Sequence, residues 1–126
     1  MLSQVPDAET IRRVAVQLDS GVDVARDDLA AAARAVTSTL KARHPGRTIE
    51  VRVPPFAAVQ VGATHGDGPT HSRGTPPNVV EMDAATAVRL AAGSLAWDDA
   101  VTRGLIRHSG AHAADVRAML PIFGLF

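Results

Sequence analysis

The segment 63–78 holds the side chains best suited to chemistry, set among glycine, proline and short polar residues. Two histidines and an aspartate in the order His65-x-Asp67-x-x-x-His71 supply three groups of the kind that bind zinc. A metal site needs three or four ligands that converge, and the surrounding glycines disfavour a rigid, preformed set. We therefore expect solvated loop histidines here and no metal site.

Ser72 lies between His71 and Arg73, which suggests a nucleophile beside its base. Catalytic triads are assembled in space from separate segments, however, and the chain has no Gly-x-Ser-x-Gly elbow. The glycines of the same segment do not follow a phosphate-binding pattern. The chain contains no cysteine, which excludes thiol catalysis, disulfides and cysteine–metal sites. We predict a protein that is not an enzyme, with no catalytic residue and no cofactor.

Two pairs of adjacent aspartates, Asp27–Asp28 and Asp98–Asp99, are also candidates for acid–base chemistry. Each pair falls near the start of a predicted helix, where capping and the helix dipole account for it. General acid–base catalysis requires a cleft and a perturbed pKa, which no sequence pattern shows. We therefore assign no catalytic role to these carboxylates.

Residues 71–78 combine two prolines, a glycine hinge and four groups able to make directional hydrogen bonds. One interpretation is that these groups contact a ligand. The other is structural, with Arg73 paired to Glu81 and Asn78 satisfying a turn. The sequence leaves both open.

The C-terminal residues are unusually apolar for the end of a chain. Burial of each large side chain would contribute about 1.5–3 kcal/mol, whereas leaving them all in water would promote aggregation. They form the edge of a core, a lid over a cavity or a dimer contact. The residues concerned are Leu120, Ile122, Phe123, Leu125 and Phe126.

Hydrophobic periodicity predicts the elements that must position these groups. Alternation places Ile49, Val51 and Val53 on the inner face of a strand. Asp23 and Asp83 are expected N-caps of the second and third helices. We predict helices over 7–18, 24–43, 84–92, 96–103 and 113–120, and strands over 48–53, 56–61, 78–82 and 105–109. This order indicates an α+β fold with a mostly antiparallel sheet covered by helices.

Composition narrows the class of protein. The chain has 126 residues, with 46% hydrophobic and 21% charged side chains, which is typical of a single globular domain. The 13 basic and 13 acidic side chains balance, so we expect no nucleic-acid partner. We find neither a signal pattern nor an apolar run of about 20 residues, and expect a cytoplasmic protein without stable membrane insertion.

Two stretches resemble the actinobacterial proteins named sterol-carrier orthologues: residues 52–60, Arg-Val-Pro-Pro-Phe-Ala-Ala-Val-Gln, and residues 73–81, Arg-Gly-Thr-Pro-Pro-Asn-Val-Val-Glu. The order of elements after residue 78, punctuated by Gly93, Gly104 and Gly110, is also similar to sterol carrier protein 2. The resemblance covers nearly the whole chain and implies one domain over 1–126. It further implies a sheet of four to five strands and helices that enclose an apolar tunnel, with any fifth strand hidden in 63–78.

On this basis we expect a non-enzymatic carrier of an apolar or amphipathic small molecule. The alternatives are a protein-interaction module of the same fold without a cavity, with a homodimer as one outcome, or an accessory domain of an enzyme. His71 and Arg73 are the expected polar mouth of the site. Its expected apolar wall consists of Phe56, Val59, Val80, Leu90, Trp97, Met119, Ile122 and Phe123.

Overall fold

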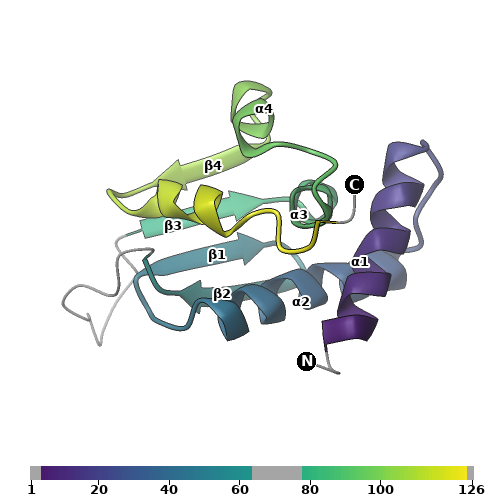
Figure 1. The fold of residues 1–126 in the computed structure, drawn as a ribbon. Helices are drawn as coiled ribbons and strands as arrows, with labels where there is room; N and C mark the ends of the chain where they lie inside the picture. The colour runs from purple at the N-terminus through teal and green to yellow at the C-terminus, as the bar shows by residue number, and fades with distance from the viewer. Residues whose placement is uncertain (1–3, 64–77, 125–126) are drawn as a thin grey trace.

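A computed structural model describes residues 4–63 and 78–124 of the chain (Figure 1). The candidate ligands His65, Asp67 and His71 therefore lie outside the described residues. Ser72 and Arg73 also lie outside the described residues, so the predictions for residues 64–77 stay predictions.

The sheet is mixed, with the strand order β2-β1-β3-β4. The outer pairs β1–β2 and β3–β4 are antiparallel, whereas the central pair β1–β3 is parallel. The predicted α+β class and predominantly antiparallel pairing are thus confirmed, with four strands among residues 4–63 and 78–124. Their bounds are Ile49–Val53 for β1, Ala57–Val61 for β2, Asn78–Met82 for β3 and Ile106–Ser109 for β4.

The helices form a second layer. In Figure 1, α2 and the 3₁₀ helix η1 lie on the same side of the sheet, α2 against β2 and η1 against β3 and β4. The helix α3 packs on α2, and α1 packs on both α2 and α3. The helices are α1 (Gln4–Asp19), α2 (Arg26–Arg43), α3 (Ala84–Ala92), α4 (Trp97–Thr102) and η1 (Ala113–Met119).

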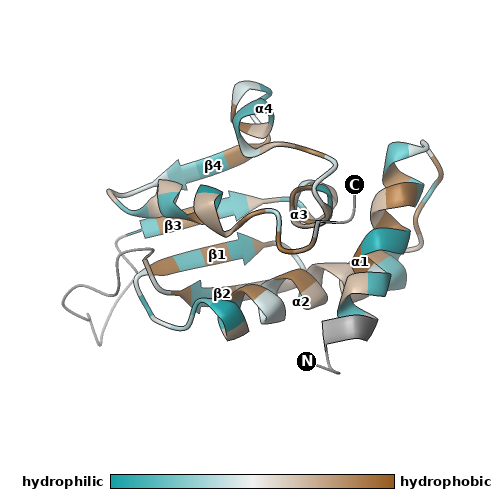
Figure 2. Cartoon of the chain, viewed as in Figure 1, coloured by the Kyte–Doolittle hydropathy of each residue, from teal (hydrophilic) through white to brown (hydrophobic). Residues whose placement is uncertain are grey.

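Alternation along the central strands decides which face is buried. The predicted inner residues Ile49, Val51 and Val53 are at most 1% exposed, and β3 repeats the same pattern. Figure 2 shows hydrophobic and hydrophilic residues along β1, while β4 is mostly hydrophilic. The apolar face of the sheet and the helices above it therefore enclose one core.

The opposite face of the sheet carries charged side chains at paired positions of adjacent strands. Arg52 on β1 lies opposite Glu81 on β3, and Glu81 lies opposite Arg107 on β4. The Arg52 Nε atom also donates a hydrogen bond to Glu50, which raises the pKa of Arg52 above its usual value. These lateral pairs neutralise one another and suit a solvated sheet face.

Helix starts and stops explain two further boundaries. Asp83 is the N-cap of α3 as predicted, because its carboxylate accepts a hydrogen bond from the Thr86 N–H at 2.8 Å. Gly93 ends the same helix at a φ of +95°, a conformation that favours glycine. The helix α2 was predicted to within two residues, but Asp23 as its N-cap was wrong: Ala25 occupies the N-cap and makes no side-chain capping bond there.

Candidate functional site

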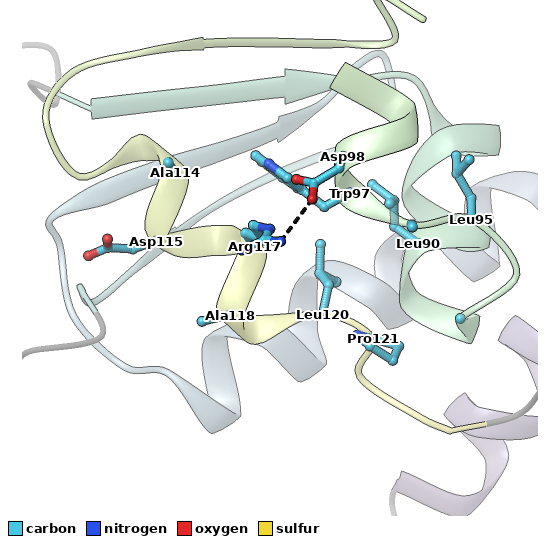
Figure 3. A pocket seen from close by; sticks show the side chains of 12 residues that line it. Leu90, Leu95, Trp97, Asp98, Ala114, Asp115, Arg117, Ala118, Leu120 and Pro121 are labelled. Atoms are coloured by element: carbon cyan, nitrogen blue, oxygen red, sulfur yellow. Dashed lines mark hydrogen bonds and ion pairs between the residues drawn. The ribbon is translucent and has the colours of Figure 1, made fainter. Parts of the chain in front are cut away.

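A groove of about 500 Å³ opens between the end of α3, the start of α4 and one side of η1 (Figure 3). It is partly open to solvent. Residues 90–98 and residues 114–121, two separate stretches of the chain, therefore line one groove. We define the groove by its lining: Leu90, Gly93, Leu95, Ala96, Trp97, Asp98, Ala114, Asp115, Arg117, Ala118, Leu120 and Pro121.

The floor of the groove is apolar. Leu90 from α3 and Trp97 from α4 are 1% and 8% exposed, so they belong to both the core and the groove lining. The Trp97 ring lies 6.3 Å from the His108 ring between centroids. Leu120 adds a half-buried side chain from the opposite wall, as Figure 3 shows. Such a floor is suited to an apolar molecule.

Charged side chains stand at the mouth of the groove. The Arg117 Nη2 atom on η1 donates to the Asp98 Oδ2 atom on α4 at 2.8 Å, the contact dashed in Figure 3. Both side chains are largely exposed, at 62% and 69%. Asp115 also contributes to the lining, with its Oδ2 atom 3.5 Å from His112 Nδ1. The mouth is thus polar while the floor is not.

A buried amide anchors the N-terminal end of η1. Asn78, at the start of β3, is 4% exposed, and its Nδ2 atom donates to the Thr48 carbonyl at 3.0 Å. Its Oδ1 atom accepts the backbone N–H of His112 at 2.8 Å. The suggestion that Asn78 satisfies a turn missed this role, because both partners are more than 25 residues away in sequence.

The C-terminal end of η1 is fixed by the segment that follows it. The Ala91 carbonyl accepts hydrogen bonds from the backbone N–H groups of Ile122, at 3.0 Å, and Phe123, at 3.1 Å. The Arg43 Nη1 atom donates to the Ile122 carbonyl, and the Arg43 guanidinium lies 4.9 Å from the centre of the Phe123 ring. The apolar chain end therefore packs on its own core as far as Phe123, whereas Leu125 and Phe126 lie outside the described residues.

The structure divides the predicted ligand wall into three groups. Leu90 and Trp97 line the groove. Val80, Met119 and Ile122 are buried members of the packed core. Phe56, Val59 and Phe123 are partly buried against that core, and Phe56 instead lies 5.1 Å beneath the Arg26 guanidinium. The expected mouth residues, His71 and Arg73, lie outside the described residues.

Sequence reasoning missed the charged mouth of the groove. The sequence places Asp98 only at a helix start, and no motif singles out Arg117. The one available signal was the placement of Asp98 directly after the sole tryptophan, Trp97. An ion pair between residues 19 positions apart has no local pattern that would reveal it.

Two further properties of the described residues bear on function. Across 4–63 and 78–124, no three histidine or carboxylate side chains gather closely enough to hold a metal ion. In the same part of the chain, every helix is too short or too polar to cross a membrane.

Comparison with known proteins gives the family. No curated protein sequence matches the chain. The profile of the family described as "Bacterial SCP ortholog" matches residues 25–122, which is more than three quarters of the chain and includes every strand and every groove residue. The α+β fold agrees with the predicted resemblance to sterol carrier proteins. The chain therefore belongs to the bacterial family of sterol-carrier-protein orthologues.

Proposed function

We propose that this protein is a non-enzymatic carrier that binds an apolar or amphipathic small molecule in the groove between α3, α4 and η1. Membership of a sterol-carrier-like family supports a carrier role. The size and lining of the groove support this position for the binding site. Binding would be non-covalent, with the apolar body of the ligand on the floor and its polar end at the mouth.

The observation that carries the proposal is the combination of size and lining. A volume of about 500 Å³ falls within the range of roughly 300–1,000 Å³ typical of small-molecule sites. Such sites are mostly apolar, with a few polar groups that orient the ligand. Leu90, Trp97 and Leu120 supply the apolar surface, and Asp98 and Arg117 supply the polar groups.

Trp97 provides the test, because it is the only tryptophan of the chain and lines the groove. Titration with dodecanol below its solubility limit should change the Trp97 fluorescence along a saturable curve. The double variant Ala114→Phe/Ala118→Phe adds two rings to exposed groove-lining positions and should weaken binding at least tenfold, because the rings occupy the space of the ligand.

The matched control is Ala31→Phe, which places the same ring at an exposed helical alanine of α2 outside the groove. This variant should bind dodecanol as the unmodified protein does. Equal affinity in the double variant and the unmodified protein would contradict the proposed site. Native mass spectrometry of protein purified without detergent should, in parallel, detect a co-purified apolar molecule.

A further inference from the structure

We propose that the groove selects amphiphiles whose polar end is an uncharged or cationic hydrogen-bond donor and discriminates against carboxylates, with Asp98 as the selecting residue. This inference rests on the proposed function and names the ligand class of the same site. Hydroxyl and amine groups share the relevant chemistry, because each donates a hydrogen bond and neither carries negative charge.

The first argument is the charge of the lining. Among the groove residues, Asp98 and Asp115 are acidic and Arg117 is the single basic side chain. The Asp115 carboxylate lies near His112, at the outer end of η1. Asp98, by contrast, faces Arg117 across the mouth. Asp98 is therefore the acidic group that the polar end of a ligand would approach.

The second argument is that the arginine is already engaged. The Arg117 Nη2 atom donates to Asp98 Oδ2 at 2.8 Å. A ligand carboxylate would compete with Asp98 for this guanidinium and would remain close to a like charge. A hydroxyl or ammonium group, however, can donate to the Asp98 carboxylate without breaking the ion pair, because a carboxylate has about four acceptor positions.

The third argument concerns position. Asp98 directly follows Trp97, and the two side chains differ sharply in exposure: Trp97 is 8% exposed, whereas the Asp98 side chain is 69% exposed. An apolar body that covers the Trp97 ring therefore brings the attached polar end to Asp98. Because the floor and the mouth of the groove are adjacent, binding of the ligand's apolar body is coupled to recognition of its polar end.

Three probes with the same twelve-carbon chain separate the effect of the polar end from that of the apolar body: dodecanol, dodecylamine and dodecanoate. Trp97 fluorescence at pH 7, low salt and concentrations below micelle formation should give a Kd for each. We expect dodecanoate to bind about two- to fivefold more weakly than dodecanol, the size of one like-charge contact at an exposed site. Added salt should reduce this ratio.

Asp98→Asn removes the negative charge and leaves Arg117 free for a carboxylate. The ratio of the dodecanoate Kd to the dodecanol Kd should fall to one or below in this variant. Asp99→Asn, one residue further along the same helix turn and outside the lining, is the matched control and should keep the ratio of the unmodified protein. The amide oxygen introduced by Asp98→Asn still accepts a hydrogen bond from a hydroxyl group, so the dodecanol Kd is the internal reference for any change in groove shape.

The outcomes separate the two proposals. Tightest binding of dodecanoate to the unmodified protein, or an unchanged ratio in Asp98→Asn, would overturn the selection while leaving the groove as a binding site. Absence of saturable binding for all three probes would overturn the proposed function and the selection together. The ranking with dodecanoate last, lost in Asp98→Asn and kept in Asp99→Asn, supports both.

Discussion

Asn78 illustrates how one buried polar side chain can position a whole wall of the site. Its amide joins the Thr48 carbonyl before β1 to the His112 N–H before η1, so it links three segments through two hydrogen bonds. A buried polar group is tolerated where its partners are complete. Because Asn78 is 4% exposed, bulk water has little access to this bridge.

Replacement of Asn78 by alanine should lower the free energy of unfolding by about 1–3 kcal/mol, because the Thr48 carbonyl and the His112 N–H both lose a partner. Urea unfolding followed by Trp97 fluorescence measures this. Ser109→Ala, at the exposed end of β4, is the control and should change stability by no more than about 0.5 kcal/mol. A loss no larger in Asn78→Ala than in the control would refute the anchoring role.

At the level of single residues, the sequence was informative mainly where the cause is local, although the local prediction of Asp23 as the N-cap of α2 was wrong. The Asp83 cap and the Gly93 stop depend on neighbours within a few positions, and both were predicted. The Asp98–Arg117 pair and the Asn78 bridge depend on segments that meet only after folding. No spacing rule of a single chain contains that information.

Among the elements, η1 differs from the other helices. It is a 3₁₀ helix of 7 residues, longer than most such segments, and it forms one entire side of the groove. Its buried residues Ala113, Val116 and Met119 face the core, while Ala114, Arg117 and Ala118 face the groove. Because 3₁₀ hydrogen bonds have poorer geometry than those of an α-helix, η1 depends on its anchors at both ends.

The C-terminal anchor can be weakened by Arg43→Met, which removes the hydrogen bond to the Ile122 carbonyl and the cation above the Phe123 ring. We expect a loss of about 1–2 kcal/mol of stability from these two interactions together. Dodecanol affinity should fall severalfold, because Leu120 and Pro121 of the groove wall directly precede the anchored residues.

Lys41→Met is the control for this variant, since Lys41 is an exposed basic residue in the same last turn of α2. Urea unfolding and dodecanol titration should both match the unmodified protein. If Arg43→Met loses stability without any change in affinity, the anchor supports the fold but does not shape the groove.

The elements themselves were largely predictable. Period-two alternation located β1, and short runs bounded by turn residues located β2 and β3, each to within one residue. The pattern defines which face of a strand is buried but not which strand lies beside it. The parallel pairing of β1 with β3 therefore emerged only from the structure, as did the 3₁₀ form of η1.

On the scale of the whole molecule, α1 lies before the residues that the family profile matches but packs on the same core. The family match begins at residue 25, after this helix has ended, yet Ile11, Val14 and Ala15 of α1 are fully buried. The Arg89 Nε atom of α3 also donates to the Asp19 carboxylate at 2.8 Å. The helix is consequently part of the same core rather than an appendage, and its removal would uncover α2 and α3.

Ile11→Ala should therefore lower the free energy of unfolding by about 2–5 kcal/mol, the usual cost of truncating a large buried side chain. Unfolding in urea should remain a single transition when followed by Trp97 fluorescence and by circular dichroism. Val16→Ala, on the same helix but 37% exposed, should cost less than about 1 kcal/mol. Two separate transitions would show that α1 unfolds independently.

Family and fold class were predictable from the sequence because a resemblance combines many weak signals, and the family profile matches residues 25–122. The position of the groove was not predictable, since the groove forms where α3, α4 and η1 meet at the edge of the core. Two residues of the expected ligand wall, Leu90 and Trp97, line the groove because apolar side chains at such a junction belong to both the core and the groove. Which core residues reach a surface hollow depends on how helices pack, and the hydrophobic pattern alone does not determine that.

The central position of the parallel β1–β3 pair has a consequence for synthesis on the ribosome. The β1–β2 hairpin and the two N-terminal helices are complete once residue 61 has emerged, but β1 then still lacks its second neighbour. One side of the nascent sheet stays unpaired until Asn78–Met82 follows, and unpaired strand edges favour aggregation. The time needed to translate residues 62–77 thus sets how long this edge of β1 stays unpaired in the nascent chain.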